Sequence, residues 1–434
     1  SFSSECTFSR RHICGADDTN WIHLSATMFW VMIMKKIVCA ALVLFLTLSA
    51  CGEAPPAETQ EPSEEVGSVV KVACVCAQPS VFGPTSLNGY EYQITHYDYG
   101  EHERYIADLT SGNAPDLVLF RARPFGEYPG LDVNNEYYDD LYEYIDADDT
   151  LGRESFLPNL LEAMSRGGEL KFLSRQVEIA TFVARESAVG DGYGLLPSDY
   201  ERIMAENPGY QSLFDTFVTK SSLLDSVCII SERAFTDREN ASCDFDNDYF
   251  RSLLEFCNSS PYDEYVDGQS TYDFDNTLLK REYLSSALRF NVMPGVYGDD
   301  PVFVGFPDGD RGCSYYICGL GYAIPAQSSN KEGAWAYIKH MLSVEAQRYV
   351  TAGLPVILKA FELALEDGDV SEDMQRKALE LLERTKYAES VQDSGLKEII
   401  TDSCQNYFDG TATLDDTVDI IQSRASVYMS EQYG

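Results

Sequence analysis

The side chains best suited to do chemistry in this chain are its tyrosines and carboxylates. The sequence has 28 Tyr and 70 Asp and Glu residues among 434. Aromatic rings stack on the C–H faces of sugar rings, while carboxylates and amides form hydrogen bonds with sugar hydroxyl groups. Such groups act together in a concave site with apolar walls and a few placed polar side chains. The composition therefore favours binding chemistry, and a carbohydrate fits it as a ligand.

Catalytic and cofactor motifs are missing from the sequence. It has no G-x-S-x-G, no P-loop and no G-x-G-x-x-G after a strand. His96 and His102 lie six residues apart across a strand–helix junction, which is a poor spacing for zinc. Residues 244–255 imitate a calcium loop, but Tyr249 stands where that loop needs glycine, so helix capping explains these acids better. We expect no catalytic residue, metal site or cofactor; a surface enzyme with paired carboxylates is an alternative that composition cannot support.

Cys51 follows a leader-like segment. Lys35 and Lys36 precede an apolar run over residues 37–46, and small residues lead up to Cys51. A basic start, a short apolar middle and small residues before a cut site are typical of a secretory signal peptide. The run is shorter than the roughly 20 residues of a membrane span. The ending Leu48-Ser49-Ala50-Cys51 resembles the bacterial lipobox, which implies cleavage before Cys51 and lipid on its sulfur and amino group. An uncleaved anchor or a buried leader helix is the alternative.

The leader divides the first 66 residues into three parts. Residues 1–33 are polar and patternless, so Met34 is the expected start and 1–33 an upstream extension. Residues 34–50 are the predicted signal peptide. Residues 51–66 are rich in Glu and Pro and predict a solvated linker. The protein would then be exported and anchored to the outer face of the bacterial cytoplasmic membrane through lipidated Cys51.

The charge of the chain is strongly one-sided. It has 32 Lys and Arg against 70 Asp and Glu, a net charge of −38. Such a surface repels phosphate backbones, so a nucleic-acid partner is not expected. It also favours a neutral or cationic ligand over an anionic one. The chain from Cys51 onward is too long for one ordinary core, so we expect two lobes.

The cysteines leave the redox state open. After Cys51, the even number of Cys residues permits disulfides, but spacing does not give their connectivity. Cys313 and Cys318 are the nearest plausible pair, and buried free thiols are the alternative. Cys74 and Cys76 lie in one strand-like run, where alternation sends them to opposite faces.

Strand and helix patterns alternate in the first third of the chain. Residues 69–75 and 116–120 are apolar runs typical of buried strands, and residues 90–97 alternate as a strand. A short helix is predicted over residues 101–111. This order indicates a βαβ unit and an α/β lobe. Further on, Ser329 and Glu332 predict a capping box before a helix over residues 332–342.

Two blocks carry a family resemblance. Residues 111–118, SGNAPDLV, resemble the G-x-x-P-D-hydrophobic segment of extracellular solute-binding proteins. The block 303–360 is more specific: it has Gly-Phe-Pro at 305–307, Lys-Glu-x-Ala-Trp at 331–335, Ser-x-Glu-Ala-Gln at 343–347 and Gly-Leu-Pro-Val at 353–356. This run is similar to the family 1, carbohydrate-type branch of these binding components of ABC importers.

The resemblance implies an α/β, two-lobed fold of the periplasmic-binding-protein or Venus flytrap type. Mixed sheets would be flanked by helices and the lobes linked by crossover strands. The first lobe would comprise residues 67–172 and 310–358, and the second residues 173–309 and 359–434. A monomer would capture a sugar or oligosaccharide between the lobes and deliver it to the transmembrane subunits of an ABC permease. Candidate ligand-binding residues are Asp116, Arg121, Arg175, Gln176, Tyr297, Phe306, Asp308, Tyr315 and Tyr316.

The chain departs from the family pattern in two places. Residues 78–89 leave no room for the long helix that usually separates the first two strands, and the crossover segment 170–184 lacks its usual proline. A binding protein for a peptide, a polyamine or a metal is therefore an alternative. A degenerate relative that acts as a sensor or adhesin is another.

Overall fold

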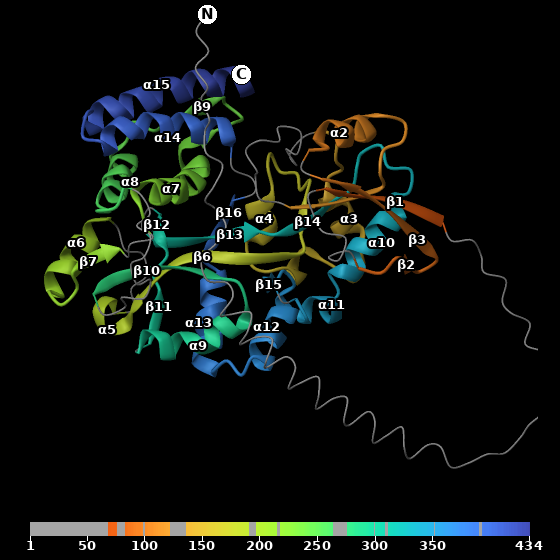
Figure 1. Ribbon diagram of the computed structural model, residues 1–434, viewed down its shortest axis with the longest axis horizontal. Coiled ribbons are helices and arrows are strands. Elements are labelled where there is room, and N and C mark those ends of the chain that lie inside the picture. The colour runs from red at the N-terminus through yellow and green to blue at the C-terminus, as the bar shows by residue number, and fades with distance from the viewer. Residues whose placement is uncertain are drawn as a thin grey trace, which may run out of the picture. The chain divides into compact units, whose positions relative to one another are not determined.

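Two β-sheets organise the described part of the chain (Figure 1). The computed structural model describes residues 68–75, 83–98, 100–121, 136–190, 197–214, 218–263, 276–298, 300–308, 311–350, 352–389 and 393–434. They belong to one unit, Glu65–Gly434. The predicted extension, signal peptide and linker, with Cys51, lie outside these ranges, as does Cys76. No helix within the ranges combines the length and the apolar character needed to cross a membrane.

The first sheet has six strands, and the predicted βαβ unit forms its centre. β1 pairs in parallel with both β3 and β4, and α2 (His102–Thr110) connects β3 to β4. The apolar side chains of β1 and β4 are almost all buried, as expected for strands covered on both faces. In order across the sheet the strands are β2 (Ser86–Leu87), β3 (Tyr90–Tyr97), β1 (Ser68–Val75), β4 (Leu117–Arg121), β14 (Leu320–Ala323) and β5 (Leu173–Ser174).

Helices from two parts of the chain cover this sheet. They are α2, α3 (Leu141–Ala147) and α10 (Lys331–Met341). Two further short helices lie beside other elements, α4 (Leu160–Met164) against β16 (Thr385–Ala388) of the second sheet and α11 (Val344–Arg348) against α12 (Leu358–Asp367). The predicted cap of α10 at Ser329 is wrong by one residue, because Asn330 accepts the hydrogen bond from Gly333 N at 3.1 Å. The Ser329 hydroxyl is used elsewhere and donates to Asp116 at 3.2 Å.

The second sheet is built around the long strand β6 (Gln176–Arg185). Along β6, Val177 and Ile179 join one hydrophobic cluster, while Ala180 and Phe182 join another on the opposite face. The main path of the sheet is β12 (Phe306–Asp308), β13 (Arg311–Cys318), β6, β10 (Thr277–Leu284) and β7 (Ser212–Phe214); β11 (Pro301–Phe303), β15 (Leu354–Pro355) and β16 (Thr385–Ala388) pair beside it. A separate hairpin joins β8 (Thr236–Asp237) to β9 (Ser242–Cys243).

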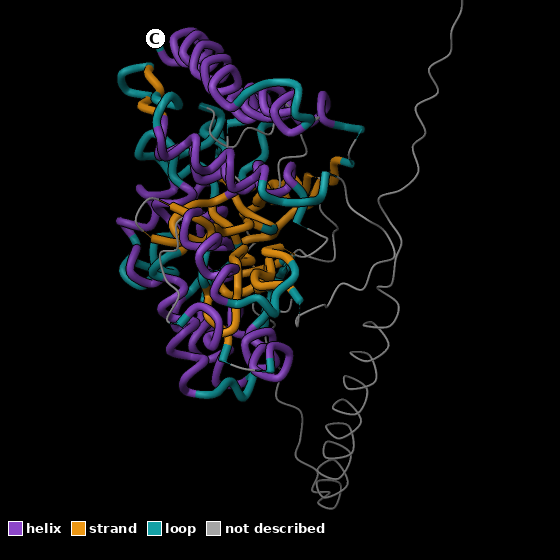
Figure 2. Tube along the Cα trace, turned by 90° about the vertical axis from the view of Figure 1, so that its left-hand side faces the viewer, coloured by secondary structure: helices purple, strands orange, loops and turns teal. Residues whose placement is uncertain are grey.

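Helices cover both faces of the second sheet (Figures 1 and 2). On one face lie α9 (Ala287–Tyr297), α12 (Leu358–Asp367) and α13 (Glu372–Leu382). On the other lie α7 (Lys220–Phe235), α8 (Asp248–Asn258), α14 (Ser394–Phe408) and α15 (Leu414–Tyr433). Two shorter helices, α5 (Glu186–Val189) and α6 (Pro197–Glu206), lie near the end of β6.

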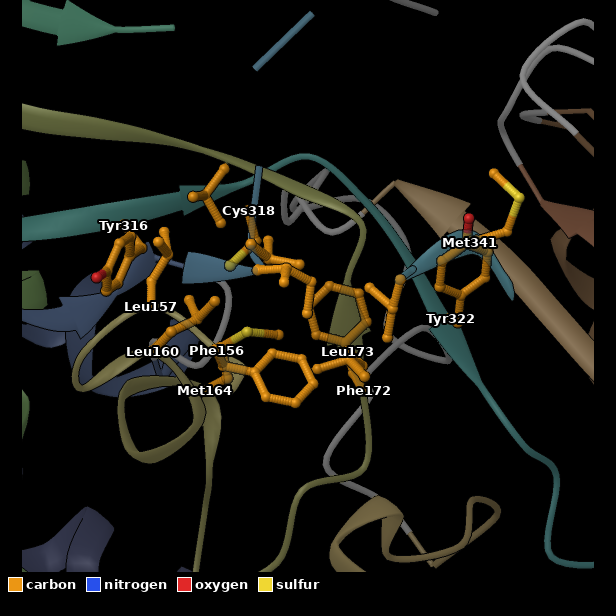
Figure 3. Packing of buried hydrophobic residues seen from close by; sticks show 14 of the residues in the cluster. Phe156, Leu157, Leu160, Met164, Phe172, Leu173, Tyr316, Cys318, Tyr322 and Met341 are labelled. Carbon is orange, nitrogen blue, oxygen red and sulfur yellow. The ribbon is translucent and has the colours of Figure 1, made fainter. Parts of the chain in front are cut away.

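Two passages of the chain between the sheets take place at single residues, and a longer one follows α11 and leads into β15. Arg175 separates β5 from β6, and Gly319 separates β13 from β14. The two crossings touch, because Arg175 N donates to Leu320 O at 2.7 Å and Gly319 N donates to Gln176 O at 3.2 Å. β13 therefore lies in the second sheet, whereas the sequence-based division began the return to the first lobe at residue 310. Figure 3 shows the core that runs through this junction, from Tyr316 past Leu173 to Tyr322.

Of the two alternatives left open for Cys313 and Cys318, the structure shows no disulfide between them. Both side chains are buried, as is that of Cys74. Five positions apart in one strand, Cys313 and Cys318 point to opposite faces and join different hydrophobic clusters.

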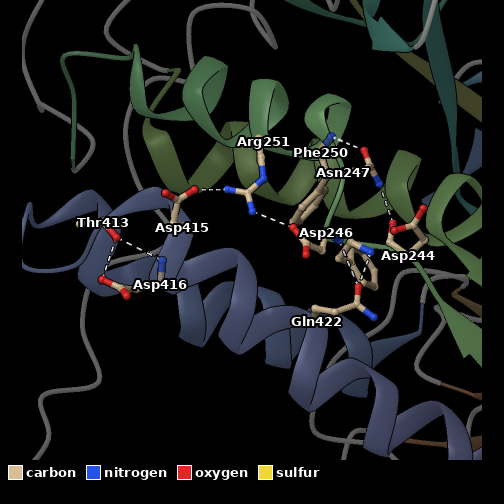
Figure 4. Close-up of polar contacts among 10 residues, drawn as sticks. Asp244, Asp246, Asn247, Phe250, Arg251, Thr413, Asp415, Asp416 and Gln422 are labelled. Atoms are coloured by element: carbon tan, nitrogen blue, oxygen red, sulfur yellow. Dashed lines mark hydrogen bonds and ion pairs between the residues drawn. The ribbon is translucent and has the colours of Figure 1, made fainter.

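The acidic segment before α8 caps a helix, as predicted (Figure 4). Asn247 accepts from Phe250 N at 2.9 Å, and Gln422 of α15 accepts from Phe245 N at 2.6 Å. Arg251 joins Asp246, at 2.7 Å, to Asp415 of α15. Across the residues that the structure describes, no group of His, Cys, Asp and Glu side chains is arranged to hold a metal.

Candidate functional site

A groove lies on the second sheet beneath α7. Its volume is about 490 Å³. Strands β6, β10 and β13 form its floor, α7 forms one wall, and Glu389 and Lys397 close the side near α14. The lining residues are Glu178, Ser222, Asp225, Ser226, Ile229, Arg281, Tyr283, Tyr315, Ile317, Glu389 and Lys397. We refer to this set as the groove.

A second cavity of about 430 Å³ adjoins the groove and shares Ile229 with it. The turn Ser165–Gly168, which precedes the first crossing, lines one side. The β8 segment, residues 236–239, lines the other side, with Tyr387 and Ala388 of β16. The adjoining cavity is therefore bounded by segments that come before and after the crossing at Arg175.

Three tyrosines stand in one row, two of them on the floor of the groove and the third in the adjoining cavity. Tyr283 of β10 pairs with Ala180 of β6, Ala180 pairs with Tyr315 of β13, and Tyr315 pairs with Tyr387 of β16. Residues in register project to the same face of a sheet. The small Ala180 side chain leaves space between the rings of Tyr283 and Tyr315. Tyr283 is 42% exposed and Tyr315 only 4%, so Tyr283 offers the accessible ring.

Polar groups surround this ring. The Arg281 guanidinium carbon lies 5.5 Å from the Tyr283 ring centroid, and Arg281 Nη1 donates to the Ser222 carbonyl at 3.1 Å. Lys397 pairs with Asp225 at 2.9 Å. The hydroxyls of Ser226 and Tyr315 lie 3.3 Å apart. Burial raises the pKa of Tyr315, so its hydroxyl stays neutral and can donate or accept.

This arrangement suits non-covalent recognition of a polyhydroxylated ligand. An exposed aromatic ring supplies a stacking surface, and hydroxyl, carboxylate and guanidinium groups around it supply donors and acceptors.

Among the sequence-predicted residues, Tyr315 lines the groove. Asp308 lies behind the adjoining cavity, where it accepts from the Tyr387 hydroxyl at 3.3 Å and contacts Lys386 Nζ at 3.5 Å. Phe306 packs in the core beneath, with its ring centroid 5.3 Å from that of Tyr315.

Arg121, Arg175 and Gln176 gather at the crossing between the sheets. Arg121 pairs with Leu320, although its side chain is not among those described. Gln176 Nε2 donates to the Ala352 carbonyl. Arg175 and Gln176 do not line the groove.

Three predicted residues have internal partners away from the groove. Asp116 lies at the amino end of β4, buried among donors from residues 71 and 328–330. The Tyr297 hydroxyl donates to Glu282 at 3.0 Å, and the Tyr316 hydroxyl donates to the Pro158 carbonyl at 2.8 Å. As ligand contacts, all nine residues stay predictions.

The residues predicted from the sequence did not include the exposed aromatic ring and the arginine of the groove. Arg281 and Tyr283 belong to β10, whose sequence TLLKREYL was not assigned to a strand. Read with a period of two, that segment places Arg281 and Tyr283 on one face, which is the signal that could have found them.

Comparison with known proteins identifies the fold. The sequence matches no protein-family model and no curated protein. The structure is similar to the sugar-binding protein MalE from Xanthomonas citri, with a TM-score of 0.60, 14% identity, and coverage of 84% of this chain and 98% of that one. It is also similar to the cyclic alpha-maltosyl-1,6-maltose binding protein from Arthrobacter globiformis, with a TM-score of 0.55, 13% identity, and coverage of 84% and 100%.

A third relative carries the family name that the sequence suggested. It is an extracellular solute-binding protein of family 1 from Alicyclobacillus acidocaldarius, with a TM-score of 0.54, 11% identity, and coverage of 84% of this chain and 98% of that one. At these identities the similarity concerns the fold. The predicted α/β fold is thereby confirmed: this chain has the fold of sugar-binding ABC solute-binding proteins such as MalE and the family 1 extracellular solute-binding proteins.

Proposed function

We propose that this protein is a solute-binding lipoprotein of an ABC importer, which captures a sugar or oligosaccharide between its lobes and delivers it to a membrane permease. The observation that carries the proposal is the Tyr283 ring, 42% exposed in a groove rich in hydrogen-bonding groups. The fold supports the same function, because the proteins with similar structures include a sugar-binding protein and a cyclic alpha-maltosyl-1,6-maltose binding protein.

Capture would involve a hinge motion between the lobes. The crossings at Arg175 and Gly319 are short and adjacent, so a few backbone angles there can rotate one sheet against the other. A ligand in the groove that also touches the turn Ser165–Gly168 would contact both lobes. Because it contacts both lobes only when they are together, it would stabilise the closed form.

Lipid on Cys51 would hold the protein at the outer face of the cytoplasmic membrane. A diacylglycerol on the sulfur with a further acyl chain gives the multiple-chain anchoring that stable attachment needs. The test is metabolic labelling with palmitate in a bacterial host. The wild type should take up label and fractionate with membranes, whereas Cys51→Ser should be unlabelled; equal labelling of the two proteins would contradict the proposal.

The ligand class is tested by thermal shift and calorimetry against sugars, peptides, polyamines and divalent metals. We expect a sugar to raise the melting temperature. The exposed 42% of Tyr283, for an aromatic side chain of about 200 Å², corresponds to about 80 Å². At about 25 cal/mol/Å² this contributes about 2 kcal/mol, so Tyr283→Ala should weaken sugar binding about 30-fold.

Tyr349→Ala is the matched control, because Tyr349 is 75% exposed and lies outside the groove. It should leave sugar affinity unchanged. Stabilisation by a polyamine, a peptide or a metal, with no sugar effective, would refute the carbohydrate proposal. If the protein turned over a glycan, it would be an enzyme and not a binding protein.

A further inference from the structure

Arg281 carries a charge in the groove that no carboxylate balances among the described residues. Lys397, the other cation of the groove, pairs with Asp225 at 2.9 Å. Arg281 instead donates from Nη1 to the Ser222 carbonyl at 3.1 Å and lies over the Tyr283 ring. A guanidinium has five N–H donors in a planar fork. Most of them are therefore available to a bound molecule.

The surroundings of Arg281 add to its positive potential. The hydrogen bond from Arg281 reaches the first turn of α7, a helix of 16 residues. Thr219 caps that turn by accepting from Ser222 N at 3.1 Å. The amino end of a helix carries a partial positive charge that favours nearby anions. Two independent sources of positive potential thus meet at this end of the groove.

Two of the three acidic residues of the groove, Glu178 and Glu389, lie away from Arg281. Arg281 pairs with Phe182, and Glu178 lies four residues along β6 from Phe182. At about 3.4 Å per residue this places Glu178 about 14 Å from the Arg281 position along the strands. Glu178 pairs with Ile317, and Glu389 follows Ala388, which pairs with Tyr316, so Glu389 continues the same row. The groove therefore has Arg281 at one end and Glu178 at the other, with Tyr283 between.

We propose that the ligand is an acidic carbohydrate, a uronate-bearing sugar, whose carboxylate is bound by Arg281 while its ring stacks on Tyr283. Arginine matches a carboxylate with two parallel N–H···O bonds, which gives both strength and orientation. Glu178, at the far end of the groove, repels the same carboxylate, so the ligand binds in one direction, with its hydroxyls toward this acid. This inference rests on the proposed carbohydrate function and narrows its ligand.

The proposal reverses the expectation drawn from the net charge of −38. Exposed charges are screened beyond about 8 Å at physiological salt, so acids elsewhere on the surface contribute little inside the groove. The nearer acid Asp225 is balanced by Lys397. The local charge at Arg281 therefore decides which ligand is bound.

The test is a calorimetric titration of the protein with galacturonic and glucuronic acid and their di- and trisaccharides, each beside its neutral parent sugar. The best uronate should bind at least tenfold more tightly than its parent, and raised salt should reduce that ratio. Arg281→Gln should bind the uronate and its neutral parent equally tightly. Arg281→Lys should keep part of the preference for the uronate. Arg202→Gln, at an exposed arginine outside the groove, should leave it unchanged.

The outcomes distinguish failure of the acidic ligand from failure of the carbohydrate function. A neutral sugar that binds as tightly as its uronate, in the wild type, overturns the acidic ligand and leaves the carbohydrate function intact. Failure of every sugar, acidic or neutral, overturns both. The wild-type comparison needs no variant, so it decides even if Arg281→Gln does not fold.

Discussion

Asp116 is the residue whose replacement best separates a structural role from a ligand-binding one. Its side chain is 1% exposed. Oδ1 accepts from Ser328 Oγ, Ser329 N and Asn330 N, each at 2.9 Å, and from Ser329 Oγ at 3.2 Å. Oδ2 accepts from Lys71 N at 2.9 Å. The carboxylate thus ties β1 to the turn that begins α10.

The cost of Asp116→Asn follows from these contacts. Wherever the new amide nitrogen points, it faces at least one donor and cannot accept from it. A hydrogen bond to a charged group contributes about 1.5–3 kcal/mol, and a buried donor left without a partner costs about 1–3 kcal/mol. Because part of this is relieved by small shifts, we expect a loss of about 2–4 kcal/mol in the free energy of unfolding.

Urea denaturation, followed by circular dichroism and extrapolated to water, measures this loss. Asp402→Asn is the control, because the Asp402 side chain is 60% exposed and its replacement should change stability by less than about 0.5 kcal/mol. Sugar affinity, measured on folded protein, should be the same in the wild type and both variants. If Asp116→Asn kept its stability and lost sugar binding, Asp116 would be a ligand contact and the structural reasoning would be refuted.

Two further predictions concern the stability of the fold, one at Asp393 beside the second sheet and one at Gly321 in the first sheet. Burial opposes ionisation of Asp393, but hydrogen bonds from Tyr428 and other donors outweigh it and lower its pKa below 3.8. The resulting stabilisation is present above pH 3.8 and is lost as the pH falls through the folded-state pKa. The melting temperature of Asp393→Asn should therefore fall less than that of the wild type between pH 5 and pH 3. An equal fall in the two proteins would contradict this prediction. A methyl group at Gly321 would overlap the Phe172 ring, so Gly321→Ala should cost about 1–3 kcal/mol. Gly112→Ala, where nothing lies within 4 Å, should cost much less in the same melt, and equal losses would argue against the close packing.

Local patterns correctly predicted the three strands β1, β3 and β4 of the first sheet and the helix α10, because a single run or face of residues decides each of them. β1 and β4 are apolar runs, and a strand buried on both faces needs such a run. The block 303–360 predicted the fold through its family resemblance, which rests on residues that are close together in sequence. The α10 cap was misplaced because Ser329 and Asn330 can both cap a helix, and the buried Asp116 takes the Ser329 hydroxyl.

The groove was harder to predict because it depends on pairing between distant strands. Tyr315 became a candidate because it lies in the block that carries the family resemblance. Its row partners Tyr283 and Tyr387 come from strands β10 and β16, and only the register of β6 and β13 brings them together. Tyr316 illustrates the opposite case, since the residue after Tyr315 in a strand must face the other side, where it meets Pro158.

The central claim is that the groove on the second sheet binds a carbohydrate, and a crystal structure of the protein with its best-binding sugar tests it most directly. We predict a sugar ring stacked on Tyr283, with an acidic group within hydrogen-bonding distance of Arg281 and contacts to the turn Ser165–Gly168. A sugar bound elsewhere, with Tyr283 and Arg281 left in solvent, would contradict the account.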